Sequence, residues 1–317
     1  MSLDLAAIRA AHGRIRPHIV RTPVLTNPAL DAACGGRLFF KCENLQAVGA
    51  FKARGAVNAV FSLPDADAAR GVVAHSSGNH GAAVARAARL RGIPAHIVMP
   101  HNSARSKLRN VEVYGAKVTL CEPNLTAREA ACARISAETG AVLIHPFDDY
   151  AVMAGQGTAA LELIEDAGPF DLVLAPIGGG GLLSGTAVAT KALLPSARVI
   201  GAEPAGGADA AESFRAGRRV NWPKVDTIAD GLRTNCVGER NLPLLRQFVD
   251  DIVTVTDDEI VAAMRELWEN LKIVIEPSCA VPWAAIRAGK VDVRGKRAGL
   301  ILTGGNVDLD HLPWQET

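Results

Sequence analysis

Three features of the sequence predict an α/β fold built around mainly parallel sheets. Short apolar runs of β-forming residues alternate along the chain with longer Ala-rich stretches of helical character. This alternation is typical of βαβ units, whose strands run parallel. The runs are apolar throughout, which suits strands that are covered by helices on both faces. The chain also has no repeats, low-complexity tracts or long polar linkers, so any two domains are expected to be interleaved.

The elements can be placed in order along the chain. Strands are expected at 38–41, 72–75, 96–99, 117–121, 172–175, 199–202, 252–255 and 299–302. The clearest helical stretches are 82–90, 127–138 and 257–271. Compact βα units from residue 72 onward indicate a smaller lobe. We therefore predict a small domain at 71–147 and a large domain formed by 1–70 and 148–317.

Composition and charge exclude several classes of protein. The 317 residues are 49% hydrophobic and 21% charged, which is enough for a large buried core. The 34 Lys and Arg nearly balance the 33 Asp and Glu, and no basic footprint for nucleic acid is visible. No apolar stretch approaches the roughly 18 residues of a membrane span, and the N-terminus lacks the apolar segment of a signal peptide. The six cysteines form no C-x-x-C pair, so we expect a reducing, cytoplasmic location without zinc or disulfides.

A run of four glycines follows one predicted strand and opens a helical stretch. It consists of Gly178, Gly179, Gly180 and Gly181. Ligands in open α/β sheets bind beyond the carboxyl ends of strands, and backbone N–H groups at a helix start bind anions. The run therefore favours a phosphate site over a flexible turn, although it does not fit the P-loop pattern. The one match to the dinucleotide pattern, at 155–160, lies inside a helical stretch and is interpreted as packing.

A second strand-to-helix connection, at 75–81 (His-Ser-Ser-Gly-Asn-His-Gly), is rich in groups that bind a carboxylate. Its hydroxyls, amide and backbone N–H groups would surround an anion at a helix start. The simpler interpretation is an N-cap by Ser77 or Asn79, and the two interpretations are compatible. His80 by itself is more often a structural residue than a catalytic one.

Lys52 follows Phe51 in the segment 48–55 (Val-Gly-Ala-Phe-Lys-Ala-Arg-Gly). On spacing alone it is one of many lysines, for which a solvated position is the default. An apolar setting would lower its pKa and favour Schiff-base chemistry. The local pattern does not single it out.

Nine short motifs, spread over nearly the whole chain, form a specific set. They lie at 21–24 (Arg-Thr-Pro-Val), 39–44 (Phe-Phe-Lys-Cys-Glu-Asn), 50–56 (Ala-Phe-Lys-Ala-Arg-Gly-Ala), 76–81, 154–158 (Ala-Gly-Gln-Gly-Thr), 178–181, 228–231 (Ile-Ala-Asp-Gly), 275–278 (Ile-Glu-Pro-Ser) and 303–308 (Thr-Gly-Gly-Asn-Val-Asp). In content and order this set resembles the fold-type-II pyridoxal-5′-phosphate (PLP) enzymes, specifically the serine/threonine dehydratase and serine racemase family. The resemblance implies a fold like that of the tryptophan synthase β-subunit, with two interleaved open parallel-sheet domains and helices on both faces.

The resemblance assigns a cofactor site. Lys52 would carry PLP as an imine and, once freed by the substrate, would abstract the Cα proton. The four glycines at 178–181 would cradle the phosphate, Asn79 would bond the ring hydroxyl, Phe51 would pack near the ring, and Thr303 would face the pyridine nitrogen. A neutral hydroxyl stabilises a pyridinium less than an Asp does, which favours prompt loss of a β-leaving group.

The resemblance also assigns substrate contacts for a small amino acid. Ser76, Asn79 and adjacent backbone N–H groups would hold the α-carboxylate, with His80 in the same segment. Ser77 resembles the second acid/base of serine racemase, with a helix cap as the alternative. Arg128 matches an arginine near the substrate in serine racemase, and the alternative is a solvated helix arginine.

A divalent-cation site and a homodimer are implied in the same way. Glu203 and Asp209 match the cation ligands of the family, and the Gly207 carbonyl would be the third protein ligand. Two carboxylates, a carbonyl and waters suit Mg²⁺, Mn²⁺ or Ca²⁺, whereas the alternative is a polar loop. The ion would lie away from PLP and act structurally or allosterically.

Two departures from the family bear on the substrate. Ala50 stands where many relatives have Ser, and Phe147 stands where serine racemase has Asn. Ala50 and the segment 304–314 make the chain more similar to bacterial 3-hydroxyaspartate dehydratases, whose second substrate carboxylate needs a cation such as Arg128.

The predicted function is β-elimination of threonine, serine or 3-hydroxyaspartate, which gives a 2-oxo acid and ammonia. A serine racemase is the alternative within the family. A PLP- or amino-acid-binding protein without turnover is the alternative from another class, and a nicotinamide dehydrogenase is disfavoured because the dinucleotide pattern is misplaced.

Overall fold

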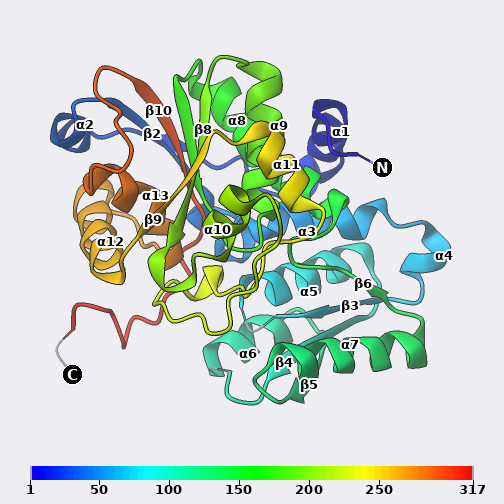
Figure 1. The fold of residues 1–317 in the computed structure, drawn as a ribbon. Helices are drawn as coiled ribbons and strands as arrows, with labels where there is room; N and C mark the ends of the chain where they lie inside the picture. Colours follow the sequence, from blue (N-terminus) through cyan, green and yellow to red (C-terminus); the bar gives the residue numbers. More distant parts are fainter. Residues whose placement is uncertain (1, 77, 104, 316–317) are drawn as a thin grey trace.

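The computed structural model describes residues 2–76, 78–103 and 105–315, which form two β-sheets with helices on their faces (Figure 1). The strands are β1 (Val24–Leu25), β2 (Arg37–Cys42), β3 (Val72–His75), β4 (Ala95–Pro100), β5 (Lys117–Cys121), β6 (Val142–Leu143), β7 (Leu172–Pro176), β8 (Arg198–Pro204), β9 (Asp251–Val255) and β10 (Arg297–Leu302). The α-helices are α1 (Leu5–Ile15), α2 (Pro28–Cys34), α3 (Lys52–Ser62), α4 (Asp65–Ala68), α5 (Asn79–Arg91), α6 (Arg105–Glu112), α7 (Leu125–Thr139), α8 (Tyr150–Ala167), α9 (Gly181–Leu193), α10 (Asp209–Ala216), α11 (Asn241–Phe248), α12 (Asp257–Leu271) and α13 (Pro277–Arg287). Short 3₁₀ turns are η1 (Arg16–His18), η2 (Glu43–Leu45), η3 (Ala47–Gly49), η4 (Ala205–Gly207) and η5 (Asp230–Leu232).

The strands and helices agree closely with the sequence prediction. Every predicted strand is present, and its ends differ from the prediction by two residues at most. The three predicted helices correspond to α5, α7 and α12. The strands β1 and β6 were not predicted, because two residues are too few to show a periodic pattern.

The larger sheet has the strand order β1-β2-β10-β7-β8-β9. All its pairs are parallel except β1 with β2. The central strand β10 lies between β2 and β7, where Leu300 pairs with Phe40 on one side and Leu174 on the other. Trp283 of α13 packs edge-on against Phe40 on one face, and α8 and α9 cover the opposite face. Both faces are thus buried, as the apolar strands predict.

The smaller sheet has the order β5-β4-β3-β6 and is entirely parallel. Neighbouring residues of β4 face opposite helices, since Ile97 packs in the cluster with α5 and Val98 in the cluster with α7. All four strands fall within the predicted small domain, 71–147, and β1, β2 and β7–β10 fall within the predicted large one. The two interleaved sheet units are confirmed, and the domain boundaries themselves stay a prediction.

Helix α8 contains the dinucleotide-like sequence at 155–160 and uses its glycines for packing. A Cβ on Gly155 would lie 2.6 Å from the Arg54 carbonyl oxygen, and one on Gly157 would lie 2.8 Å from the Gly185 carbonyl oxygen. The glycines therefore let α8 approach α3 and α9 closely, which confirms the interpretation as packing. None of the described helices is both long and apolar enough to cross a membrane.

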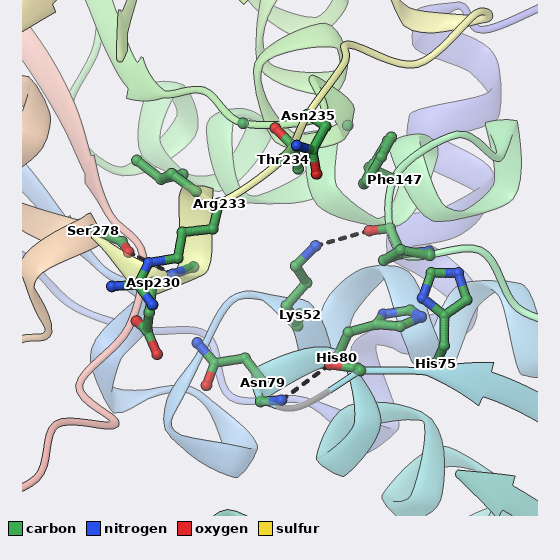
Figure 2. A pocket seen from close by; sticks show the side chains of 18 of the residues that line it. Lys52, His75, Asn79, His80, Phe147, Asp230, Arg233, Thr234, Asn235 and Ser278 are labelled. Carbon is green, nitrogen blue, oxygen red and sulfur yellow. Dashed lines mark hydrogen bonds between the residues drawn. The ribbon is translucent and has the colours of Figure 1, made fainter. Parts of the chain in front are cut away.

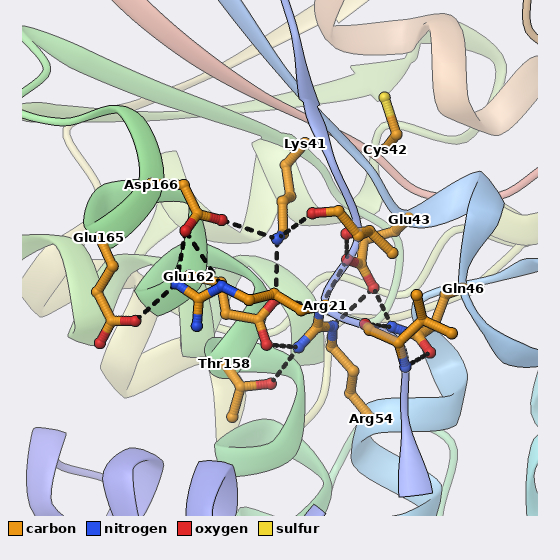
Figure 3. Close-up of polar contacts among 12 residues, drawn as sticks. Arg21, Lys41, Cys42, Glu43, Gln46, Arg54, Thr158, Glu162, Glu165 and Asp166 are labelled. Carbon is orange, nitrogen blue, oxygen red and sulfur yellow. Dashed lines mark hydrogen bonds and ion pairs between the residues drawn. The ribbon is translucent and has the colours of Figure 1, made fainter. Parts of the chain in front are cut away.

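A fully buried group of charges, which we call the Arg54 cluster, holds the start of α3 in place (Figure 3). It consists of Lys41, Glu43, Arg54 and Glu162 together with Thr158. The Arg54 guanidinium donates to Glu43 at 2.7 and 2.8 Å and to Glu162 at 3.0 and 2.7 Å. Lys41 Nζ lies 2.8 Å from Glu162 Oε2. Two positive and two negative charges balance, as burial requires.

The rim of the Arg54 cluster reaches solvent on the side of α1 and the segment before β1. His12 Nε2 lies 3.2 Å from Glu162 Oε1, and Arg21 pairs with Glu165 and Asp166. Burial would raise the pKa of Glu162, but the bonds from His12 and the buried cations lower it well below its usual value. The cluster joins β2, η2, α3 and α8, and so fixes the helix that begins with Lys52.

Candidate active site

A cavity of about 680 Å³ opens where the carboxyl ends of β3, β4, β7 and β10 meet. This is the edge at which ligands bind in open α/β sheets. The cavity brings together most of the predicted cofactor and substrate residues, which are Phe51, Lys52, Ser76, Asn79, His80, Arg128, Gly178, Gly179, Gly180, Gly181 and Thr303. Ser77 lies outside the described residues.

Lys52 is the first residue of α3, and its side chain stands in the middle of this cavity (Figure 2). Its Nζ donates to the Pro146 carbonyl at 2.8 Å and lies 5.2 Å from the centre of the Phe51 ring. The residue as a whole is half-buried at the cavity. Burial lowers the pKa of the amine to about 8, and the charge of Glu276 opposes part of that fall.

Asn79 is held by two other polar side chains. Its Nδ2 donates to the Glu276 carboxylate at 2.9 and 3.2 Å, and its Oδ1 accepts from Asn306 Nδ2 at 2.8 Å. Asn306 also donates to the carbonyl of Val48, the first residue of the segment that contains Lys52. The interpretation of Asn79 as an N-cap is wrong, because Gly78 precedes the helix and Asn79 is its first residue. The amide is instead oriented toward the cavity.

The glycine run forms a tight turn between β7 and α9. A Cβ on Gly179 would lie 2.3 Å from the Phe147 ring, and one on Gly178 would lie 3.2 Å from Leu232 Cα. Gly180 has φ +102°, a backbone conformation that residues other than glycine rarely adopt. Larger residues would therefore fill or distort the turn, whereas glycines leave the backbone N–H groups of the helix start open to the cavity.

Thr303 follows the central strand β10 and is buried at the cavity floor. Its backbone carbonyl accepts a hydrogen bond from the Phe51 N–H at 2.9 Å. Its Oγ1 has no hydrogen-bond partner among the described residues. A buried hydroxyl without a partner is costly, so it is suited to contact a bound ligand.

Three histidines with neutral rings line one wall of the cavity. Burial lowers the pKa of His75 to about 4, with His145 and Arg128 adding to the fall, and it also lowers the pKa values of His145 and His80. His80 Nε2 lies 2.9 Å from the Ile144 carbonyl, so this nitrogen carries the proton. His80 Nδ1 is then an acceptor, and it has no partner in the described part of the chain.

Arg128 lies on α7 and is half-buried at the cavity wall. Its Nε donates to the Asn124 carbonyl of the same helix at 3.3 Å. Its charge helps to lower the pKa of His75, which places the guanidinium on the histidine side. Arg128 therefore lines the cavity, and its contact with a substrate stays a prediction.

Two further arginines line the cavity that were not predicted from the sequence. Arg219 donates from Nε to the Val237 carbonyl at 2.9 Å. Arg233 donates to the Thr227 carbonyl from Nε at 2.8 Å and also from Nη2. Both are anchored by main-chain carbonyls, so these bonds leave their positive charges uncompensated.

The predicted cation ligands lie outside the lining of the cavity. Glu203 is fully buried, and its two carboxylate oxygens accept the N–H groups of Ala210 and Ala211 at the start of α10. Asp209 is also fully buried, and neither of its carboxylate oxygens has a hydrogen-bond partner within the described ranges. Burial raises the pKa of Asp209 to about 7. Burial and the Asp209 charge raise the pKa of Glu203 well above its usual value.

Several residues at the cavity were not assigned a role from the sequence. Glu276 and Asn306 belong to quoted motifs, so their positions could have been noticed, but their contact with Asn79 depends on the fold. Arg233 and Thr234 lie within three residues of the end of the quoted 228–231 motif. The Pro146 carbonyl carries no sequence signal, because every residue has one.

Comparisons with known proteins agree with this geometry. The family model described as "Pyridoxal-phosphate dependent enzyme" matches residues 15–304. A beta-hydroxyaspartate dehydratase of Paracoccus denitrificans is 50% identical over 305 residues, covering 96% of each chain. A serine racemase of Arabidopsis thaliana is 48% identical over 314 residues, covering 98% of this chain and 95% of the relative. The structure of maize serine racemase superposes with a TM-score of 0.95 at 46% identity, covering 98% of this chain and 95% of that one. The lysine in its cavity, the glycine turn and these matches together show that the chain belongs to the family of pyridoxal-phosphate dependent enzymes.

Proposed function

We propose that the protein eliminates the β-hydroxyl of a small hydroxy-amino acid, namely serine, threonine or 3-hydroxyaspartate, and releases a 2-oxo acid and ammonia. The single observation that carries this proposal is the Lys52 amine, which stands inside the cavity with a pKa lowered to about 8. The names of similar proteins support the reaction class, since beta-hydroxyaspartate dehydratase and L-threo-3-hydroxyaspartate ammonia-lyase are among them.

The residues around the cavity fit PLP. The glycine turn at 178–181 has no room for side chains and would hold the phosphate through backbone N–H groups. Lys52 would hold the aldehyde, Phe51 would contact the ring, and Asn79 would face its hydroxyl. Thr303 Oγ1, which has no hydrogen-bond partner among the described residues, would face the pyridine nitrogen. When bound, PLP supplies an electron-withdrawing ring that makes bonds to the substrate Cα easier to break.

Lys52 is the proposed base at Cα. A lysine with an ordinary pKa of 10.5 would be almost entirely protonated near pH 7, whereas a pKa of about 8 leaves a useful fraction of neutral amine. The neutral Nζ can then accept the Cα proton of the substrate. Overall, the substrate loses its β-hydroxyl with this proton as water, and water later replaces the nitrogen, which leaves as ammonia.

The segment at the start of α5 is the proposed anchor for the substrate α-carboxylate. Ser76 Oγ accepts the Gly78 N–H at 3.1 Å, which places this hydroxyl beside the helix start. Asn79 and His80 follow, and both line the cavity. Backbone N–H groups at this helix start attract an anion. Arg128 would contribute a positive charge from α7.

The test of this function is the Lys52→Ala variant. We expect it to lose both the absorbance near ~410–420 nm typical of a PLP Schiff base and the release of 2-oxo acid from serine, threonine and 3-hydroxyaspartate. Borohydride reduction of the unmodified enzyme, followed by peptide mapping, should place the modification on Lys52. Lys191 is a matched control, since its amine is tied to Asp250 and the Ala197 carbonyl outside the cavity. Full activity in Lys52→Ala would refute the assignment.

Serine racemisation is the second candidate, and the 48% identity to a serine racemase favours it specifically. Ser77 would be the second acid/base opposite Lys52. Chiral analysis of serine after incubation separates the two reactions. Formation of D-serine without matching pyruvate would identify a racemase, and a Ser77→Ala variant should then lose racemisation before elimination.

A divalent cation is proposed at Glu203, Asp209 and the Gly207 carbonyl. The support is the buried Asp209 carboxylate, whose oxygens lack hydrogen-bond partners among the described residues, next to a second buried carboxylate. An oxygen-ligated Mg²⁺, Mn²⁺ or Ca²⁺ would neutralise both. Chelation by EDTA should lower the melting temperature or the activity. No change after confirmed metal removal would count against this site.

The remaining predictions concern assembly and location. We propose a homodimer, which light scattering on the purified protein would test. A cytoplasmic location and the absence of nucleic-acid and membrane partners stay predictions.

A further inference from the structure

Two unlike walls face each other across the cavity, with Lys52 and Asn79 between them (Figure 2). Phe147, His75 and His80 form one wall, and their rings are uncharged because burial holds the pKa values of both histidines far below 7. The opposite wall carries Arg233 together with Asp230 and Ser278 (Figure 2). The Arg233 wall thus presents a guanidinium, whereas the rings of Phe147, His75 and His80 carry no charge.

Arg233 is held in a defined position at that wall. Its Nε and Nη2 both donate to the Thr227 carbonyl, so one edge of the guanidinium is fixed. The preceding backbone is fixed as well, because Gly231 donates its N–H to Ser278 Oγ at 3.0 Å. Leu232 Cα lies against the glycine turn, 3.2 Å from the place where a Cβ on Gly178 would be. A planar, pre-oriented guanidinium is the group best suited to bind a carboxylate.

The way a dicarboxylic substrate would lie in the cavity decides whether Arg233 or Arg128 can reach its second carboxylate. The proposed α-carboxylate anchor at the start of α5 and Arg128 on α7 both belong to the unit with the smaller sheet. Arg233 lies in the other unit, beside the glycine turn. In an amino acid such as 3-hydroxyaspartate the carboxylates are attached to adjacent carbons and can point to opposite walls. One would be held by the anchor, and the other would then face Arg233.

We propose that Arg233 pairs with the side-chain carboxylate of a dicarboxylic hydroxy-amino acid and so sets the preference for it over serine. This inference rests on the proposed function and narrows it to a substrate class. Because Arg233 is exposed and Asp230 shares its wall, the pairing is partly screened. A preference of about tenfold is therefore the expected contribution.

The experiment compares kcat/KM for 3-hydroxyaspartate and for serine in matched variants. Arg233→Met removes the charge and keeps a long stem, and we expect the ratio of the two kcat/KM values to fall about tenfold. Arg233→Lys keeps the charge and should restore part of the ratio. Arg219→Met is the control. It removes another cation from the same cavity, and this cation is held by one hydrogen bond, to the Val237 carbonyl. Its ratio should stay within about twofold.

A binding measurement without turnover makes the test independent of the proposed reaction. Succinate and butyrate have the same number of carbons but differ by one carboxylate, and calorimetry on the holoenzyme gives a Kd for each. Arg233→Met should weaken succinate about tenfold more than butyrate. If the unmodified enzyme releases no 2-oxo acid from either substrate, the proposed function fails, and the succinate result still decides the role of Arg233. Equal weakening of both acids, or a loss of preference only in Arg128→Met, would overturn this proposal.

Discussion

Lys41 and Lys52 both keep their amines away from bulk water, but the protein surrounds them differently. The Lys41 amine donates to the Thr22 carbonyl at 2.7 Å and lies 2.8 Å from a Glu162 oxygen, within the balanced Arg54 cluster. The Lys52 amine has the Pro146 carbonyl at 2.8 Å as its partner and a large cavity beside it. The Lys41 amine is fully paired. The Lys52 amine is desolvated and has no neutralising contact among the described residues.

This difference indicates what each region does. In the Arg54 cluster, charge pairs satisfy one another and fix the meeting point of four elements (Figure 3). In the cavity, Lys52, Arg128 and Arg233 are held by main-chain carbonyls and remain available to a ligand. Buried pairing is expected to contribute to folding, whereas charges that face a cavity and are held only by main-chain groups are typical of functional sites.

Breaking the Arg54 cluster should have the largest effect on stability. Arg54→Met leaves Glu43 and Glu162 with a buried, uncompensated charge, so we expect a loss of about 3–5 kcal/mol in the free energy of unfolding. Urea unfolding followed by tryptophan fluorescence would measure it. Arg21→Met is the control, because this side chain is 47% exposed at the rim and should cost at most about 1 kcal/mol. Similar losses of unfolding free energy in both variants would contradict the proposed difference between the buried cluster and its rim.

The unpaired state of Lys52 should appear in the pH dependence of cofactor loading. Only the neutral amine reacts with an aldehyde, and the pKa is lowered from 10.5 to about 8, so the rate should level off above about pH 8. At pH 7 the neutral fraction is then about 300-fold larger than for an ordinary lysine. The appearance of Schiff-base absorbance after PLP is added to cofactor-free enzyme gives the rate, with N-acetyl-lysine as the control. A rate still rising steeply at pH 10 would argue against the lowered pKa.

Removing the Lys52 amine should stabilise the cofactor-free protein slightly. Because the folded pKa lies below the unfolded value, the penalty for the ammonium is full below about pH 8 and is lost as the pH rises from about 8 to 10.5. Lys52→Met should therefore raise the free energy of unfolding by about 1 kcal/mol at pH 7, after allowance for the partly open cavity. The gain should be close to zero at pH 10.5. Destabilisation at pH 7 would show that the amine contributes to folding.

The smallest expected effect concerns Glu276. Glu276→Gln keeps an oxygen that accepts the Asn79 amide but removes the negative charge that opposes the fall in the pKa of Lys52. The midpoint of the loading profile should then move below about pH 8, by a fraction of a unit. Asp148→Asn is a suitable comparison, since Asp148 lines the cavity but accepts from Arg240 and Glu239 backbone groups. A shift toward higher pH in Glu276→Gln would contradict this electrostatic role.

Much of the fold could be predicted because its elements carry strong local patterns. The predicted bounds of the apolar strands and of helix α12 agree with the structure to within two residues. Continuous apolar runs and helical periodicity are both visible in the sequence. The strands β1 and β6 were missed because their pairing depends on neighbours that are distant along the chain. Local pattern cannot show which partner a two-residue strand will meet.

The cavity could be predicted in part, where motifs identify the residues. Lys52, Asn79 and Thr303 were assigned through the family resemblance, and the structure brings them together. Arg233 was missed because an arginine in a loop has no sequence pattern of its own. Its proposed role depends on its position in the folded cavity. The N-cap role of Asn79 was wrong for a related reason, because tertiary contacts with Glu276 and Asn306 compete for its amide.

The place of β10 in the larger sheet affects the order in which the protein can form. During synthesis on the ribosome, β2 emerges early, whereas its parallel neighbour β10 is the last strand to appear. Until then, the edges of β2 and β7 that it will join stay open, and such edges invite association between unfinished chains. A nascent chain that stalls before residue 297 would thus carry two incomplete half-sheets, so we expect chaperone dependence to be concentrated in the final stretch of translation.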